Sequence, residues 1–357
     1  MSTAAGIIQT FVQKAEGLDE RTGHFDTVLT DMSFALQQET DGFVCGEVFN
    51  HIAVPTNSGN YTRYHQEYQL RHGFGERSEG STPDSIAWNA DNEGTYRAKV
   101  YAARAIIGKQ LRSNINTSVD PMRDTMEVMV EHSLIFKDEM WCEAFFKAGV
   151  WGVDKEGVAF SSIPDPATEF VYWNDYLNSD PIQDVTDIRD DFRERTGKEI
   201  NKIVMGRRVY SALINHPKIL KRVLGGFSNS GASPAKANLN TLAQLFEVER
   251  IVIAQGIHDT NATRATHTAP SPRFIAGNHV LLVHSPERTN LKKAMAGGYF
   301  CWTGYEAGVN KMGIVVDRWY DRDKKVHIME MEMACGLHVI AAGLGVFLEN
   351  AIYIPPA

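Results

Sequence analysis

Residues 179–205 read SDPIQDVTDIRDDFRERTGKEINKIVM, and this stretch predicts a capped helix that leads directly into a strand. Ser179 or Asp180 can serve as the N-cap, and Pro181 suits the first turn because its missing N–H needs no partner there. Gly197 can adopt the left-handed conformation that ends a helix. The expected buried face repeats at helical spacing and consists of Ile182, Val185, Ile188 and Phe192.

Short strands and helices alternate on the carboxyl side of this helix. We expect strands at residues 202–205 (KIVM), 250–254 (RIVIA) and 279–284 (HVLLVH), and helices at 209–214 and 239–246. Pro217 should break the first of these helices. Short helices packed against a small sheet are typical of an α+β fold, which is the fold class that the sequence predicts.

A long helix is predicted on the amino side of this unit. Asp120 is a suitable N-cap and Pro121 a suitable first residue. One face then steps by three and four: Met122, Met126, Met129 or Val130, Ser133, Phe136, Met140, Ala144 and Ala148. The pattern predicts about 28 residues, or roughly 42 Å, ended by Gly149 and Gly152. A methionine stripe at this spacing favours a packing surface over a cofactor site.

An unusually long excursion precedes this helix. Residues 43–54 favour a strand and residues 55–60 a turn. Two further runs that favour strand, residues 61–70 and 86–101, flank a tip rich in Gly, Ser, Glu and Arg whose single large apolar residue is Phe74. Such an arm leaves backbone and apolar groups without partners in its own fold, which indicates that its partners are other copies of the chain.

The carboxyl-terminal part is rich in strand signals again. MGIVV (312–316), the charged turn DRWYDRDKK (317–325) and VHIMEMEMA (326–334) predict a long hairpin. The apolar residues of its second strand do not alternate strictly, so a β-bulge is expected. Residues 339–354 form an apolar segment that we expect to be extended.

The composition excludes several classes of protein. The net charge is −8, so the chain as a whole is not built as a polycation for nucleic acid. The four cysteines are far apart and form no CxxC pair, which argues against a zinc ribbon or a disulfide framework and favours a reducing compartment. The amino-terminal 20 residues do not resemble a signal peptide. Because no run of about 18 apolar residues occurs, no membrane span is expected.

The sequence also lacks the motifs that usually accompany chemistry. Neither a GxGxxG after a strand nor GxxxxGK[ST], HExxH or GxSxG occurs. The 12 histidines are scattered, and surface polarity explains them better than a metal site. We therefore predict no catalytic residue, no metal and no cofactor.

One cluster of charge stands out. Seven cations lie between Lys198 and Arg222 against the single anion Glu199, and they include Arg207, Arg208, Lys218, Lys221 and Arg222. A solvated surface and a contact with an acidic partner, either a neighbouring subunit or DNA, are about equally favoured.

Three segments carry a resemblance to a known family. FVYWNDYLNSDPIQDV (170–185), NKIVMGRRVYSALINHPKIL (201–220) and LNTLAQLFEVERIVIAQGIHDT (239–260) resemble, in their order and spacing, the major capsid proteins of tailed bacteriophages. These proteins have the Hong Kong 97-like fold. The resemblance extends from about residue 41 to the end of the chain, and residues 76–108 are similar to the family's extended loop, the E-loop.

The resemblance implies a division of the chain. The expected parts are an N-terminal arm and first strand (1–54), the E-loop (55–118), a peripheral domain with a long spine helix (119–179), an axial domain (180–298), peripheral return strands (299–338) and a strand into the axial domain (339–357). It also implies that the predicted long helix is the spine helix. Its packing face would carry Met122, Met126, Met129, Phe136 and Met140.

The resemblance further implies a structural function. Many copies would form hexamers and pentamers of an icosahedral shell that encloses double-stranded DNA in the virion, with assembly in the host cytoplasm. The expected partners are other copies, a portal, a scaffolding protein and a decoration protein, with no membrane. The N-terminus is too short for a cleaved scaffold segment of its own, so a separate scaffolding protein, or none, is implied.

The E-loop is expected to contact neighbouring subunits through six residues: Arg71, Phe74, Glu76, Arg77, Glu79 and Trp88. Some relatives cross-link an E-loop lysine to an asparagine of the neighbour. No lysine occurs between residues 55 and 98, so closure of the shell without covalent bonds is expected.

Two other functions remain open at this stage. A cellular nanocompartment of the encapsulin type would share the fold and enclose an enzyme instead of DNA. An α+β enzyme that binds an anionic ligand through the cations between Lys198 and Arg222 is disfavoured, because no nucleophile, metal set or phosphate loop accompanies them.

Overall fold

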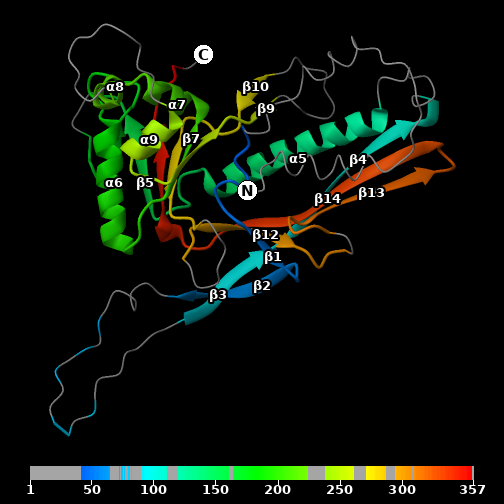
Figure 1. Ribbon diagram of the computed structural model, residues 1–357, viewed down its shortest axis with the longest axis horizontal. Coiled ribbons are helices and arrows are strands. Elements are labelled where there is room, and N and C mark those ends of the chain that lie inside the picture. Colours follow the sequence, from blue (N-terminus) through cyan, green and yellow to red (C-terminus); the bar gives the residue numbers. More distant parts are fainter. Residues whose placement is uncertain are drawn as a thin grey trace.

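The computed structural model describes residues 42–64, 72, 74, 76, 79, 80, 82, 90–110, 120–160, 164–223, 238–260, 271–286, 294–306 and 309–355. Within these residues the long helix α5 (Pro121–Phe145) lies between two sheets that share no strand. Figure 1 shows a sheet with short helices at one end of α5 and a second sheet running alongside it. The predicted α+β class is confirmed.

The first sheet has six strands in the order β6-β5-β15-β11-β7-β8. They are β6 (Glu169–Val171), β5 (Val153–Val158), β15 (Gly345–Glu349), β11 (Val280–Val283), β7 (Lys202–Gly206) and β8 (Arg250–Ala254). The predicted strands at residues 202–205 and 250–254 are therefore confirmed, and the one at 279–284 is shorter. The last strand, β15, pairs parallel with β5 and antiparallel with β11, so a segment from the end of the chain lies in the middle of this sheet.

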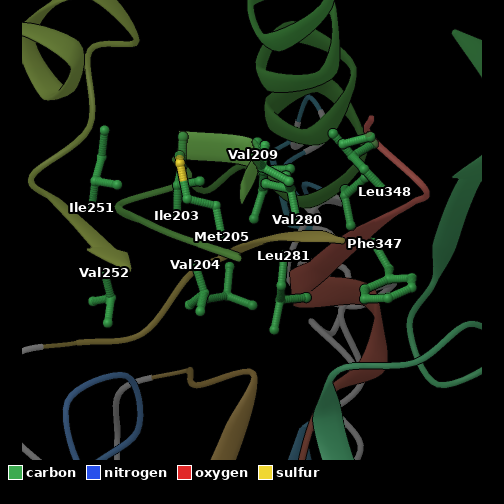
Figure 2. Packing of buried hydrophobic residues seen from close by; sticks show 14 of the residues in the cluster. Ile203, Val204, Met205, Val209, Ile251, Val252, Val280, Leu281, Phe347 and Leu348 are labelled. Carbon is green, nitrogen blue, oxygen red and sulfur yellow. The ribbon is translucent and has the colours of Figure 1, made fainter. Parts of the chain in front are cut away.

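Both faces of the central strands are buried, which explains their continuous apolar runs. Figure 2 shows Ile203 and Met205 on one side of β7 and Val204 on the other. The register places Val280 opposite Met205 and Leu281 opposite Val204, so each face is filled by cross-strand pairs.

Four helices accompany this sheet: α6 (Pro181–Thr196), α7 (Arg207–Ile214), α8 (Pro217–Val223) and α9 (Leu239–Leu245). Helix α6 has the features that its sequence predicts. Asp180 accepts a hydrogen bond from the amide of Gln183, and Gly197 ends the helix with φ of 65°. Ile182, Val185, Ile188 and Phe192 are all buried, so the predicted caps and apolar face are confirmed. Pro217 does break the chain, but it also begins α8.

The second sheet is organised by β14 (Val326–Val339), a strand of 14 residues. One edge of β14 pairs from Val326 to Cys335 with β4 (Lys99–Gly108). The other edge pairs first with β13 (Ile314–Asp321) and then with β12 (Gly297–Trp302). Strand β1 (His51–Val54) adds to β12 in parallel. The methionines at positions 329, 331 and 333 are buried on the face that α5 covers.

The hairpin of this sheet differs from its prediction in two ways. The register between β13 and β14 is continuous from Ile314–Met333 to Asp321–Val326, so the expected bulge is absent. Strand β13 also continues through residues 317–321, which were predicted to be turn. The turn is confined to residues 322–325, where Lys325 takes φ of 53°. Pairing with β14 holds residues 317–321 in an extended conformation. Their charged side chains can remain in solvent, so the pairing buries no charge.

Helix α5 begins as predicted, with the Asp120 carboxylate accepting from the amide of Met122 and Pro121 in the first turn. It has 25 residues and ends at Phe145, before Gly149 and Gly152. Its buried face is Met129, Val130, Ser133, Leu134, Lys137, Asp138, Trp141 and Phe145. Of the predicted stripe, Phe136, Met140 and Ala144 are half-buried and Ala148 is exposed. Beyond Ser133 the most buried positions are therefore shifted by about one residue, and they include two charged residues.

The excursion begins as a hairpin of β2 (Ser58–Tyr64) and β3 (Ala90–Arg97) that projects away from both sheets in Figure 1. The predicted return strand is divided, because β3 stops at Arg97 and β4 starts at Lys99. The strand predicted at residues 43–54 is reduced to β1. Residues before it form a buried turn in which Glu47 N–H donates to the Val44 carbonyl and Gly46 has φ of 96°.

Two short strands, β9 (Ile257–Asp259) and β10 (Pro272–Phe274), form a separate ribbon, and a 3₁₀ turn (Ala342–Leu344) precedes β15. That turn and β15 replace the uniformly extended segment expected at residues 339–354. The N-terminal arm predicted for residues 1–40 lies outside the described residues. Among the helices that the structure describes, none is sufficiently long and apolar to cross a bilayer.

The first sheet packs so closely against a loop that there is no room for a side chain at Gly206. A Cβ atom at this position would overlap the carbonyl oxygen of Gly277. We expect Gly206→Ala to lower the free energy of unfolding by about 3 kcal/mol because backbone would have to move. Gly343→Ala is the matched control, since a Cβ there meets no atom within 4 Å, and it should be nearly neutral. Urea unfolding of both variants checks this, and equal effects would contradict it.

Candidate functional site

The described residues offer little that resembles an active site. No group of three or more His, Cys, Asp or Glu side chains among them could hold a metal ion. The four cysteines are free thiols, two of them buried. Burial raises the pKa of Cys142 and Cys301 well above the usual value, so these thiols stay protonated and unreactive at neutral pH.

A buried carboxylate holds the chain to the middle of α5. Asp138 is 2% exposed. It accepts hydrogen bonds from the amide of Val44, at 3.0 Å to each oxygen, and from the amide of Cys45 at 2.7 Å. Burial raises the pKa of Asp138 to about 6, although these two amides oppose the shift by favouring the charged form. The segment that leads into β1 is thus fixed to the helix by its backbone.

The base of the β2–β3 hairpin is fixed by aromatic packing. The ring of Tyr96 stacks on Phe300 of β12, with centroids 4.8 Å apart and planes within 1°, and Tyr61 stacks on the same ring at 6.1 Å. Arg97 N–H donates to His338 Nε2 at 3.1 Å. These contacts set the direction in which the hairpin leaves the body.

The predicted contact residues of the E-loop are only partly described. Phe74 is 83% exposed, and Glu76 and Glu79 are also exposed. Arg71, Arg77 and Trp88 lie outside the described residues. The large apolar side chain of Phe74 is therefore left mostly in solvent.

The structure places the predicted spine-helix residues against the second sheet. Met129 is buried, while Met122, Met126, Phe136 and Met140 are half-buried and pack on the cluster formed with β14 and β4. Tyr101 of β4 meets the ring of Phe136 edge-on at 5.0 Å. Toward its carboxyl end the helix enters the other core, where Trp141 and Phe145 pack on Phe49.

The structure divides the predicted basic cluster. Lys202 is buried and donates to the carbonyls of Glu47 and Val48, so its role is structural. Arg207 and Arg208 lie exposed at the start of α7, where the Arg207 guanidinium lies 5.5 Å from the ring centre of Tyr210. Three further cations, Lys218, Lys221 and Arg222, line one open depression of about 350 Å³ together with Asp180, Ile182 and Gln183. Lys198 is exposed and is not among the residues that line it.

Sequence reasoning missed Asp138, Phe300 and Leu177. A charged residue inside an otherwise apolar helix face was the available signal for Asp138, because a buried acid needs dedicated donors. No local signal identifies Phe300, whose partners Tyr61 and Tyr96 are more than 200 residues away in sequence. Leu177 is exposed in the turn between β6 and α6, and the sequence of this turn gives no sign of the hydrogen bonds to Asp175 that order it.

Comparisons with known proteins agree with this geometry. The model of the family described as phage major capsid protein E matches residues 172–335. A curated major capsid protein of Burkholderia phage BcepMu is 26% identical over 108 residues. That match covers 30% of this chain and 31% of the relative, so the aligned part spans about a third of the length of each.

Solved structures are similar over nearly the whole chain. A phage-related protein from Bordetella bronchiseptica RB50 has a TM-score of 0.61 at 16% identity, with 93% of this chain and 98% of that chain covered. The mature capsid of bacteriophage PhiM1 has a TM-score of 0.56 at 12% identity, with 93% and 91% covered. The SrpI encapsulin of Synechococcus elongatus PCC 7942 has a lower TM-score of 0.50 at 10% identity, with 95% and 100% covered.

The architecture is therefore the Hong Kong 97-like fold of phage capsid proteins, as the sequence predicted. Within that fold, the family match and the curated relative confirm the resemblance to phage major capsid proteins.

The buried carboxylate predicts a pH dependence. The folded state of Asp138 has a pKa of about 6 against the ordinary 3.8, so it binds more protons than the unfolded state between these values. Its contribution to stability is therefore largest at low pH and is lost as the pH rises from about 4 through 6, by about 3 kcal/mol in total.

Asp138→Asn removes this titration and keeps an oxygen that can accept from Val44 or Cys45. Urea unfolding of wild type and variant at pH 4 and pH 7 measures the difference in stability between them. We expect that difference to shift in favour of the wild type at pH 4. A difference that is the same at both pH values would contradict the assigned burial.

The aromatic base of the hairpin predicts a local effect. Phe300→Ala should remove both ring contacts, each worth about 1 kcal/mol beyond its buried area. Backbone amides of β2 and β3 should then exchange with solvent at least tenfold faster, with a smaller change in the six-stranded sheet. Phe300→Tyr, which keeps the ring, is the matched control. Uniformly faster exchange throughout the protein would show that Phe300 supports the core and not the hairpin specifically.

Proposed function

We propose that this chain is a major capsid protein whose copies assemble into hexamers and pentamers of an icosahedral shell around the double-stranded DNA of a tailed phage. The fold and the family match support this proposal. The observation within the chain that carries it is the β2–β3 hairpin, which leaves the body and presents Phe74 at 83% exposure. A protein that acted alone would gain nothing from such an arm.

Assembly in this proposal depends on many modest contacts. Each copy contributes the same surfaces, and closed rings multiply contacts that would be weak in a single pair. Closure is non-covalent, because no lysine lies between residues 55 and 98 to form a cross-link from the hairpin or its tip. Arg71, Arg77, Glu76 and Glu79 form ion pairs between subunits near that tip.

The domain plan follows from the same proposal. Helix α5 is the spine of a peripheral domain with the second sheet, and the part containing β7, β8 and β11 is the axial domain around the capsomer axis. The chain is located in the virion capsid and assembles in the host cytoplasm. Its further partners are a portal, a scaffolding protein or none, and a decoration protein.

The function is assembly and not catalysis. The match to the phage major capsid protein family and the curated relative support this part of the proposal. An enzyme that binds an anion through α8 would need a nucleophile or base beside the cations. The described side chains that line the depression with them are a carboxylate paired with Lys218, an amide and an isoleucine.

A cellular nanocompartment is the second candidate, because the encapsulin fold is also similar at a lower score. The two functions differ in what the particle encloses. Nuclease-protected double-stranded DNA in purified particles supports a phage capsid. A co-purifying enzyme in particles without DNA would favour the compartment.

Phe74 offers the most direct mutational test. Phe74→Asp should leave the free energy of unfolding within about 0.5 kcal/mol, because the side chain is exposed in the single chain. It should reduce the yield of shells by at least tenfold, since a carboxylate cannot be buried in an apolar contact without a partner. Sedimentation velocity measures the ratio of shells to free subunits.

Phe74→Leu, which keeps an apolar side chain, is the control and should retain most of the assembly. Normal shell yields with Phe74→Asp would show that this residue stays in solvent in the particle. A wild-type protein that sediments only as monomer or dimer under all conditions would overturn the proposed function itself.

A further inference from the structure

The turn between β6 and α6 is rigid although it lies on the surface. The Asp175 carboxylate accepts hydrogen bonds from the amides of Leu177 and Asn178, at 3.3 and 3.4 Å, and from the Asn178 side chain at 2.9 Å. The amide and hydroxyl of Ser179 both donate to the Asp175 carbonyl. The bond from the Asn178 side chain also holds the pKa of Asp175 below its usual range.

This turn presents a large apolar side chain to solvent. Leu177 is 88% exposed at its apex, and Tyr176 beside it is 39% exposed. Single exposed leucines are ordinary on protein surfaces. Here, however, the backbone is already ordered, so burying Leu177 against a partner would cost little further conformational entropy.

The turn is joined to helix α8 through His216. Ser179 Oγ donates to the Asp175 carbonyl, so it accepts from His216 Nε2 at 3.1 Å. His216 Nδ1 accepts from the amide of Lys218 at 3.2 Å. This pattern requires a neutral ring with its proton on Nε2. Tyr176 packs edge-on against the same ring at 5.5 Å. The turn and the start of α8 therefore form one fixed surface.

Helix α8 adds positive charge to this surface. Lys218 is paired with Asp180 at 3.2 Å. Lys221 and Arg222 are exposed, and neither forms an ion pair with another of the described residues. We call Tyr176, Leu177, Lys218, Lys221 and Arg222 the turn–α8 surface. It combines an ordered apolar knob with a basic rim, as the centre and edge of a protein interface do.

A complementary surface lies on helix α6. Asp187, Asp190 and Glu194 repeat at intervals of three and four, so they share one face, and all three are exposed. The other acid on this outer face, Asp191, is paired with Arg195. Among the described residues, Asp187 accepts a hydrogen bond from the side-chain amide of Gln183, and no cation pairs with Asp190 or Glu194. These three residues form an acidic stripe.

The carboxyl end of the acidic stripe lies too far from α8 of its own chain to be neutralised by it. Gln183 lines the depression beside Lys221 and Arg222, and Glu194 follows it by 11 residues, or about 16 Å along the helix axis. This exceeds the Debye length of about 8 Å at physiological ionic strength. The chain thus carries two opposite charge surfaces whose ends are too far apart to satisfy each other.

We propose that the turn–α8 surface of one copy docks on the acidic stripe of α6 in a second copy of this chain. This inference rests on the proposed function and specifies one of the contacts within the shell. A second copy fits better than DNA, because DNA would match the cations but would leave Leu177 without an apolar partner. A second copy also supplies an acidic stripe that can pair with those cations.

Charge reversal tests the contact. Lys221→Glu with Arg222→Glu, and separately Asp190→Lys with Glu194→Lys, should each reduce shell yield at least tenfold at 150 mM salt. The chain with all four substitutions restores complementarity in every contact, so its yield should return to within about threefold of the wild type. Circular dichroism and urea unfolding check that all variants fold, as expected for exposed side chains.

Two results would overturn the docking: normal assembly of either double variant, or a quadruple variant as defective as the worse double. Normal assembly together with loss of packaged DNA from the Lys221→Glu, Arg222→Glu particles would assign α8 to DNA instead. Sedimentation at 50 mM salt separates this inference from the proposed function. If no shells form but small oligomers follow the same pattern of loss and rescue, the docking contact is supported and the proposed capsid function is contradicted.

Discussion

The hydrogen bonds of the Asp138 carboxylate to the backbone of Val44 and Cys45 are the contact on which the rest of the structure depends. This carboxylate lies where α5 passes from one core to the other. Before it, Met129 and Leu134 pack on the second sheet, and after it Trp141 and Phe145 pack beneath the six-stranded sheet. By fixing the segment before β1, it also fixes the strand that extends the second sheet and the start of the hairpin. Burying a carboxylate is costly, and the backbone donors offset that cost.

The chain combines two packed cores with apolar side chains that it leaves exposed. Each sheet is packed by its own helices or by α5, so both cores are built from residues of a single chain. Yet Leu177 is exposed on a turn whose backbone is held by Asp175. An ordered turn with an exposed apolar side chain is preorganised for binding, because little entropy is left to lose. Phe74 is also exposed, and the stack on Phe300 anchors the base of the hairpin whose strands flank it in the sequence. The molecule therefore has the properties expected of a subunit.

The sequence predicted best what is decided locally. Asp120, Asp180 and Gly197 mark helix ends because caps depend on neighbours a few residues away. The buried strands at residues 202–205 and 250–254 were readable from continuous apolar runs. Predictions failed where distant residues decide. The buried face of α5 includes Asp138 because residues 94 positions earlier supply its donors. Residues 317–321 are strand because β14 pairs with them.

The candidate site was predictable only in outline. Cations near residues 218–222 were visible in the sequence, but only the fold shows that Lys202 is structural and that the Leu177 turn is attached to α8. Phe74 was identified because it is the sole large apolar residue of a polar tip.

An electron cryo-microscopy map of assembled particles would test the central claim most directly, because it shows what covers each exposed surface. We predict a closed shell in which Phe74 and Leu177 both contact neighbouring copies, with Leu177 over the acidic stripe of α6. Particles in which both side chains face solvent, or preparations that contain no closed shell, would contradict the account.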